Sequence, residues 1–170
     1  MGYKLTVSGI VEESAVDGPG LRYTVFTQGC PHACPGCHNP QTHPFDGGTQ
    51  VDTDDLLRDM MANPLLGGVT FSGGEPFCQP EPLAMLAQAV HERTKLSVIT
   101  YSGYTWEELV SNPNPAVRAL LEQTDILIDG RYIEQQRDLT LRFRGSKNQR
   151  VLDVHKSLKQ GTPVTATGNW

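Results

Sequence analysis

The sequence predicts an α/β fold made of repeated parallel βα units that form an incomplete barrel. Short runs of strand-forming residues alternate with amphipathic helical segments between residues 21 and 129, which is the pattern of a parallel sheet covered by helices. The proposed strands of these units run into polar or glycine-containing loops. Because there are so few units, we expect a barrel that does not close.

Length and composition indicate one globular domain that spans residues 1–170. The chain is 38% hydrophobic and 19% charged, and it contains no apolar run near the roughly 20 residues that a transmembrane helix needs. The net charge of -5 argues against nonspecific binding to nucleic acid. The N-terminal residues lack the apolar core of a signal peptide, so we expect a soluble cytoplasmic protein whose thiols stay reduced.

The first predicted strand or extended arm covers Tyr3 to Glu12, where apolar residues alternate loosely. A turn follows at Asp17-Gly18-Pro19-Gly20. The next strand, Leu21 to Gln28, alternates well and leads into a loop that contains three cysteines. Loops that follow the C-terminal ends of parallel strands are where active sites are usually built, so we expect this loop to carry the site.

The segment from Asn39 to Asp52 is rich in Pro, Gly, Thr and Gln and predicts a long surface loop. A helix should begin at Asp52 or Thr53 and end near Asn63-Pro64, because leucine and methionine recur between them at helical spacing. The methionines indicate packing of this helix against the core.

Two further units follow. Gly68 to Ser72 predicts a buried strand that leads into the Gly-Gly-Glu-Pro turn of residues 73–76, and a helix begins near Pro80. Leu96 to Tyr101 predicts the next strand, and Thr105 with Glu108 forms a capping box for a short helix.

The last part of the chain predicts a helix from Pro115 and a strand at Ile126 to Ile128 that ends in Asp129. Leu139 to Phe143 and Gln149 to Val154 are candidates for the last strand segments. From Lys156 onward the composition is polar and small, which favours a loosely held tail over residues 156–170.

Cys30, Cys34 and Cys37 lie in one short loop, separated by three and then two residues. This spacing lets three thiolates converge, whereas disulfides between such close neighbours would be strained. Three thiolates on a cubic iron-sulfur cluster leave one iron without a protein ligand, where substrate can bind. Cys78 is too distant in sequence to be assumed a fourth ligand.

The turn Gly73-Gly74-Glu75-Pro76 offers bare backbone for the close approach of a ligand, and Glu75 could accept a hydrogen bond from a cationic amine. Such a turn can also be purely structural. Its position one βα unit after the cysteine loop strengthens the functional interpretation.

Together, the Cys-x3-Cys-x2-Cys loop and the Gly-Gly-Glu-Pro turn resemble those of the radical S-adenosylmethionine superfamily. Within it, the chain is similar to the activators of anaerobic ribonucleoside-triphosphate reductase. The closer likeness rests on Asp17 to Gly20, the Gly29 to Asn39 loop, Asp129-Gly130-Arg131-Tyr132 and the Arg144 to Gln149 segment.

The resemblance implies a radical S-adenosylmethionine domain with a [4Fe-4S] cluster held by Cys30, Cys34 and Cys37, whose open iron binds S-adenosyl-L-methionine through its amino and carboxylate groups. It implies that reduction, by a donor such as a flavodoxin or ferredoxin, yields a 5′-deoxyadenosyl radical. That radical takes a hydrogen from a glycine of the partner, the catalytic subunit of anaerobic ribonucleoside-triphosphate reductase. Neither nucleic acid nor membrane is an expected partner.

The resemblance also suggests roles for single residues. Gly73, Gly74 and Glu75 would hold the methionine amino end of the cofactor, and Pro76 would shape the turn. The superfamily usually has an aromatic residue before the third cysteine, where this chain has Gly36, as the reductase activators do. His38 is therefore the first candidate to lie near the adenine, the alternative being a hydrogen-bonded loop histidine.

Asp17 resembles an aspartate that faces the active site of glycyl-radical activators and meets the glycine loop, although it could simply stabilise its own turn. Thr100 and Ser102 could reach the cofactor ribose, and Asp129 could lie near the cofactor or a cation; ordinary strand-end polarity is the alternative for all three. A basic run has three open interpretations, namely a solvated surface, a docking face or a contact to the cofactor carboxylate: Arg142, Arg144, Lys147 and Arg150.

Two other functions remain open from the sequence. A structural zinc module would use Cys30, Cys34 and Cys37 with Cys78 or a histidine, and it predicts a colourless protein, whereas a cluster predicts a brown one that oxygen bleaches. Within the enzyme class, the alternative is an activator of another glycyl-radical enzyme, of the formate-lyase type. The identity of the protein that acquires the radical distinguishes a reductase activator from an activator of the formate-lyase type.

Overall fold

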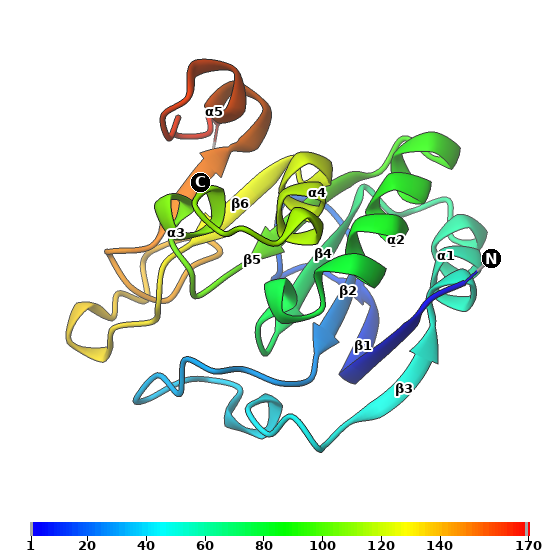
Figure 1. The fold of residues 1–170 in the computed structure, drawn as a ribbon, viewed down its shortest axis with the longest axis horizontal. Coiled ribbons are helices and arrows are strands. Elements are labelled where there is room, and N and C mark those ends of the chain that lie inside the picture. Colours follow the sequence, from blue (N-terminus) through cyan, green and yellow to red (C-terminus); the bar gives the residue numbers. More distant parts are fainter. Residues whose placement is uncertain (1, 169) are drawn as a thin grey trace.

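The computed structural model describes residues 2–168 and 170 and places seven strands in one sheet (Figure 1). The sheet order is β3-β1-β2-β4-β5-β6-β7. Within the described residues no ladder joins the edge strands β3 and β7, so the sheet is open and the predicted incomplete barrel is confirmed. The strands are β1 (Lys4–Ser14), β2 (Arg22–Thr27), β3 (Thr49–Asp52), β4 (Gly68–Gly73), β5 (Ser97–Tyr101), β6 (Ile126–Asp129) and β7 (Arg150–Asp153).

The helices begin close to the predicted positions. Thr105 and Glu108 form the predicted capping box of α3, and the Asp52 side chain caps α1. Over the described residues, no helix has the length and apolar character needed to cross a bilayer. The helices are α1 (Thr53–Ala62), α2 (Pro80–Arg93), α3 (Trp106–Val110), α4 (Pro115–Gln123) and α5 (Val154–Gln160), with 3-10 turns η1 (Pro40–Thr42), η2 (Pro76–Cys78) and η3 (Glu134–Gln136).

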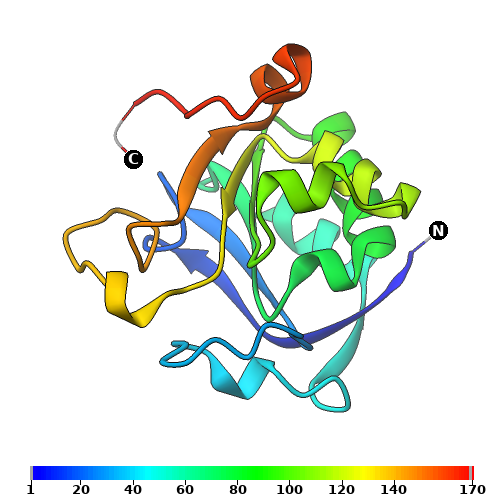
Figure 2. The same ribbon diagram turned by 60° about the vertical axis from the view of Figure 1, so that its left-hand side comes forward.

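The four predicted βα strands correspond to β2, β4, β5 and β6, which pair in parallel in this order. Their C-terminal ends therefore meet at one edge of the sheet, as predicted. The loops that leave β2 (light blue) and β6 (yellow to orange) project on the same side of the molecule in both views (Figures 1 and 2). This edge is where the candidate site lies.

The segments outside the parallel core depart furthest from the predictions. The first predicted strand is confirmed as β1, but it pairs antiparallel with both β2 and β3. Residues 39–52 are not a loop throughout, because they contain η1 and because β3 pairs with the start of β1, Lys4 lying opposite Asp52. Backbone pairing with β1 stabilises this short polar strand, so it needs no alternating apolar pattern.

The last part of the chain is more ordered than the composition indicated. Residues 154–160 form α5, capped by Asp153, and Thr165 bridges back to Leu152 of β7. Residues 156–160 thus belong to a helix where the composition predicted a loosely held tail, and Asn169 lies outside the described residues. Leu139 to Phe143 forms turns and bends, not a strand, whereas Gln149 to Val154 contains β7 as predicted.

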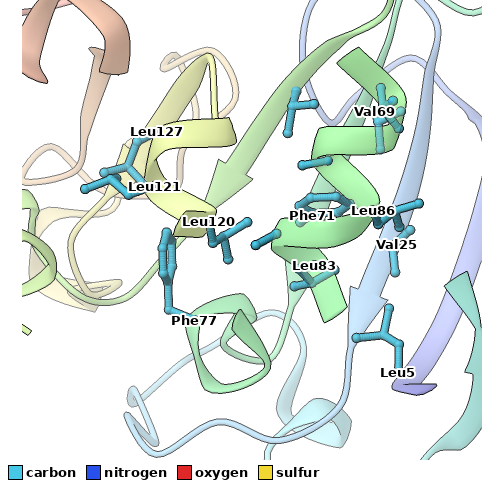
Figure 3. Close-up of a cluster of buried hydrophobic side chains, with 14 of the residues drawn as sticks. Leu5, Val25, Val69, Phe71, Phe77, Leu83, Leu86, Leu120, Leu121 and Leu127 are labelled. Carbon is cyan, nitrogen blue, oxygen red and sulfur yellow. The ribbon is translucent and has the colours of Figure 1, made fainter. Parts of the chain in front are cut away.

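The main core lies between the sheet and α1, α2 and α4 (Figure 3). Strand residues such as Val25, Phe71 and Leu127 pack there against Leu83 and Leu120 from the helices. Because side chains alternate along a strand, the other face of β2 and β4 carries Arg22, Thr24 and Thr70, which are also buried. The inner face of the open barrel is therefore partly polar.

Arg22 ties this inner face together. Its guanidinium donates to Thr70 Oγ1 at 2.8 Å, to Pro19 O at 3.1 Å and to Ser97 O at 3.0 Å. Burial lowers the pKa of Arg22 to about 10. Since Pro19 belongs to the Asp-Gly-Pro-Gly turn, this buried arginine connects that turn to the sheet beside the candidate site.

Candidate functional site

A cavity of about 390 Å³ opens at the edge where the parallel strands end. Each of the four loops predicted to meet there contributes to it: the cysteine loop after β2, the Gly-Gly turn after β4, the Ser-Gly turn after β5 and the segment after β6. Its lining includes Asp17, Cys30, Cys34, Cys37, His38, Gly73, Gly74, Tyr101, Ser102, Tyr132, Phe143, Arg144 and Gly145.

The backbone holds the cysteine loop in place. The Gly29 N–H donates to Thr42 O at 2.7 Å, and the Cys30 N–H donates to His43 O at 3.1 Å. At the other end of the loop, the Asn39 N–H points at Cys37 Sγ at 3.5 Å. The turn η1, which the sequence did not predict, therefore supports the loop.

The three thiols fit an iron-sulfur cluster. Cys30, Cys34 and Cys37 are free, half-buried and line the same cavity. Burial raises the pKa of the Cys30 thiol and the Glu75 carboxylate adds to this, so positively charged irons would be needed to favour the thiolate. Each thiolate of a cluster binds a different iron, so the sulfurs need not converge on one point.

The zinc alternative gains no support from the structure. In residues 2–168 and 170, no three His, Cys, Asp or Glu side chains come together as a site for one metal ion. Cys78 is a free thiol in η2, outside the cavity lining. Burial raises its pKa to about 11, so the thiol is protonated at neutral pH.

Gly73 and Gly74 line the cavity as expected, and both also have a structural reason to be glycine. A Cβ on Gly73, whose φ is +93°, would lie 2.5 Å from the backbone N of Thr27. A Cβ on Gly74 would strike the carbonyl oxygen of Gly29. The turn thus packs its backbone directly against β2 and the start of the cysteine loop.

The Glu75 carboxylate is fully buried and bonded to the protein. His32 Nε2 lies 2.6 Å from Oε1, which also accepts from the Gly103 N–H at 2.8 Å. The Ser102 hydroxyl lies 3.0 Å from both oxygens, and Oε2 accepts from the Phe77 N–H at 3.0 Å. Glu75 therefore joins the cysteine loop, its own turn and the loop after β5. Pro76 begins η2 and is buried.

Asp17 and His38 both line the cavity. Asp17 also accepts from the Ser14 hydroxyl at 2.5 Å, and its carbonyl accepts from Thr70 Oγ1 at 2.9 Å. The placement of Asp17 thus agrees with both interpretations, since it faces the cavity and its turn is held. His38 is exposed and lies beside the Tyr132 ring.

Two predicted cofactor contacts lie elsewhere. The Thr100 hydroxyl is buried and bonds Thr124 Oγ1 at 2.9 Å, on the side of the sheet that the helices cover. Asp129 is buried and accepts from the Trp106 N–H at 2.7 Å and from Arg150 Nε at 3.0 Å. Both side chains bond other parts of the fold and do not line the cavity. Ser102, in contrast, lines the cavity and also bonds Glu75.

The residues of the basic run make different contacts. Arg142 is exposed and lies over the Phe143 ring, and Arg150 pairs with Asp129 and Glu107. Arg144 lines the cavity, and its Nη1 donates to Gln149 O at 3.3 Å. The Arg144 Nε is buried and has no hydrogen-bond partner in the described part of the chain. An anionic group in the cavity would satisfy it.

Sequence reasoning did not single out Tyr101 and Tyr132 as cavity residues. Tyr101 follows Thr100 on β5 and so faces the opposite side, into the barrel, where its hydroxyl donates to Phe143 O at 2.6 Å. Strand alternation could have identified Tyr101 once the helix-covered face was known. Tyr132 ends the Asp-Gly-Arg-Tyr segment, whose position after a parallel strand was the available signal.

Comparison with known proteins gives consistent matches. Residues 16–152 match a family described as a 4Fe-4S single cluster domain. The anaerobic ribonucleoside-triphosphate reductase-activating protein of Haemophilus influenzae is 36% identical over 143 residues, which cover 79% of this chain and 88% of the relative. The protein of the same name from Escherichia coli K12 is 32% identical and covers 80% and 90% of the two chains.

Two further matches cover a smaller share of both chains. The pyruvate formate-lyase-activating enzyme of Clostridium pasteurianum is 37% identical over 114 residues, which cover 62% of this chain and 48% of that enzyme. Among solved structures, QueE from Escherichia coli is 17% identical, with a TM-score of 0.46 over 60% of this chain and 53% of that one.

Proposed function

Because this chain belongs to the family of anaerobic ribonucleoside-triphosphate reductase-activating proteins, we propose that it is a radical S-adenosylmethionine enzyme that installs a glycyl radical on that reductase. The observation that carries the proposal is the presence of three free thiols in one cavity with the Gly-Gly turn. That cavity lies where the parallel strands end, the usual position of a site in such sheets.

In the proposed reaction, Cys30, Cys34 and Cys37 hold a [4Fe-4S] cluster. When reduced, the cluster held by these thiolates would supply one electron for cleavage of the C5′–S bond of S-adenosylmethionine to methionine and a 5′-deoxyadenosyl radical. A glycine Cα of the reductase would then give up a hydrogen atom, which would leave 5′-deoxyadenosine and a glycyl radical. The electron comes from a low-potential donor of the flavodoxin or ferredoxin type.

The chain's own residues bind and orient the cofactor. Gly73 and Gly74 present backbone to its methionine end, and the unpartnered Nε of Arg144 suits its carboxylate. Glu75 acts through the loops that it joins, because its carboxylate already has protein donors. Asp17, beside the exposed Val16 at the cavity wall, is proposed to meet the glycine loop of the reductase.

We also propose that the chain is a single domain and works in the cytoplasm. Its four free cysteines suit a reducing compartment.

An activator of the formate-lyase type is the second candidate, since one such enzyme is 37% identical over a shorter region. The reductase activators are favoured because 143 aligned residues span 88% of the Haemophilus influenzae protein.

Cysteine variants test the cluster assignment. After anaerobic reconstitution with iron and sulfide, Cys30→Ala, Cys34→Ala and Cys37→Ala should each lose the brown [4Fe-4S] absorbance and form no 5′-deoxyadenosine from S-adenosylmethionine. Cys78→Ala is the matched control and should keep both, because Cys78 lies outside the cavity lining. If Cys78→Ala lost the cluster while one of the other variants kept it, the ligand assignment would be wrong.

A further inference from the structure

The connection between β6 and β7 is basic, although the chain as a whole is acidic. Residues 130–149 contain four arginines, one lysine and two acidic residues, a local net charge of +3 in a chain whose net charge is -5. The connection extends away from the body of the molecule, and several of its residues line the candidate cavity (Figures 1 and 2). Positive charge is therefore concentrated at the rim of the site.

Three of these cations make no ion pair. Arg137, Arg142 and Lys147 are exposed, and none of them is in a salt bridge within residues 2–168 and 170. In contrast, Arg131 pairs with Glu108 of α3. Exposed cations contribute little to stability even when they are paired, so folding alone does not explain three that are unpaired.

An exposed leucine lies among these cations. Leu139 is 80% exposed in the turn between Arg137 and Arg142, so it adds nothing to the core. The neighbouring Asp138 carboxylate accepts from the Thr140 N–H at 2.9 Å and so shapes this turn. A large apolar side chain with charges around it is the usual composition of a surface that binds another protein.

The backbone presents these side chains from a fixed loop. Arg137 and Ser146 form a β-bridge across its base. Beside this bridge, the Lys147 N–H donates to Gln136 O at 2.9 Å. We call residues 137–147 the basic loop. Because its two ends are joined, the loop loses little conformational entropy when it binds a partner.

Phe143 connects the basic loop to the cavity. Its φ of +62° lies in the left-handed region, which is rare for a bulky side chain and indicates backbone strain. The Tyr101 hydroxyl donates to the Phe143 carbonyl at 2.6 Å and supports this conformation. Arg142, before Phe143, is exposed, whereas Arg144, after it, lines the cavity. A partner bound to the basic loop therefore lies at the entrance of the site.

We propose that the basic loop docks the reductase by pairing Arg137, Arg142 and Lys147 with an acidic surface beside the reductase glycine loop. This assignment rests on the proposed function and names the surface through which the two proteins meet. Docking at the rim brings the glycine to the cavity. A nucleic acid fits less well, because a long polyanion would also meet the rest of the chain, whose net charge is -8 once the +3 of the connection is set apart.

Charge reversal tests this surface in anaerobic titrations of the reconstituted protein with the reductase. The double variant Arg137→Glu with Arg142→Glu should raise the Kd for the reductase about tenfold at low ionic strength. The difference should shrink in about 1 M salt, where exposed charges are screened beyond about 3 Å. Leu139→Ala should weaken binding severalfold at both salt concentrations, because an apolar contact is not screened.

The matched control is the double variant Arg93→Glu with Lys95→Glu, which changes the charge by the same amount. Both residues are exposed and precede β5, at the opposite end of the parallel strands from the cavity, so this variant should bind the reductase normally. None of the substituted residues lines the cavity. Every variant should therefore keep its cluster and form 5′-deoxyadenosine without the reductase at the unchanged rate.

Three results would overturn the docking surface: tight binding of the reductase by the basic-loop double variant at low ionic strength, an equal loss of binding in the control, or a loss confined to a DNA duplex. In each case the proposed function stands if the unchanged protein still forms a glycyl radical on the reductase. If the unchanged protein neither binds the reductase nor forms that radical, the proposed function and the docking surface fail together.

Discussion

The Glu75 carboxylate shows how one side chain can organise a site without facing it. Its four donors come from three segments, namely the cysteine loop, η2 and the turn after β5. His32, which lies between Cys30 and Cys34, also packs edge-on against Tyr104, with 4.5 Å between the ring centroids. The order of the cysteine loop therefore depends on a buried hydrogen-bond network.

Replacing Glu75 by glutamine tests this network. The amide of Glu75→Gln can accept through only one atom and would place N–H donors against donors of His32, Ser102 or Gly103. We expect the free energy of unfolding to fall by about 3 kcal/mol, the scale of hydrogen bonds to a charged group. Chemical denaturation measures this value.

Glu81→Gln provides the matched control for this change. Glu81 is exposed in the first turn of α2, so its substitution should alter stability by less than about 0.5 kcal/mol. Equal stability of the two variants would show that the buried carboxylate does not hold these loops together.

The helices and strands illustrate what local patterns predict well. The capping box of α3 and the apolar spacing of α1, α2 and α4 predicted helices that the structure contains. Strand β3 and helix α5 were missed. Pairing with β1 stabilises the first, which its own composition does not predict. The second is capped by Asp153 of β7, and the segment that follows it bridges back to β7 through Thr165.

The direction of side chains on β5 could not be predicted for a similar reason. Val98 and Ile99 are both buried although they face opposite sides. A central parallel strand is covered on both faces, so its sequence shows no apolar-polar alternation. Thr100 was therefore placed near the cofactor in the prediction, whereas it is Tyr101 that faces the cavity.

His91 connects α2 to the loop between α4 and β6 and makes a pH prediction possible. Its ring nitrogens lie 3.0 Å from Gln123 Oε1 and 2.9 Å from Asp125 Oδ2. Burial lowers the pKa of His91, but the hydrogen bonds to Gln123 and Asp125 outweigh it, so the pKa lies above its ordinary value of 6.5. Protonated His91 thus stabilises the folded state.

The sign of the pH effect follows from this raised pKa. The stabilisation is complete below about pH 6.5 and is lost as the pH rises through the folded-state pKa of His91. In His91→Gln, the melting temperature should consequently fall less between pH 6 and pH 8 than in the unchanged protein. Identical pH profiles would contradict the raised pKa.

The arrangement of the complete sheet explains why residues so distant in sequence form one site. Parallel pairing of β2, β4, β5 and β6 brings four loops to one edge, and the sequence predicted this convergence from strand order alone. The three cysteines, Gly73, Gly74, Asp17 and His38 were predicted to lie there and line the cavity. The buried contacts of Glu75 and Asp129 are made to residues far along the chain and were not predictable from local spacing.

Electron paramagnetic resonance of the reductase detects the glycyl radical that we propose this chain installs. The reconstituted, reduced protein is mixed anaerobically with S-adenosylmethionine and either anaerobic ribonucleoside-triphosphate reductase or a formate-lyase-type enzyme. We expect a glycyl radical signal on the reductase, with 5′-deoxyadenosine formed alongside, and no signal with Cys34→Ala. A cluster-loaded protein that leaves the reductase without a radical, or that activates only the formate-lyase-type enzyme, would contradict this proposal.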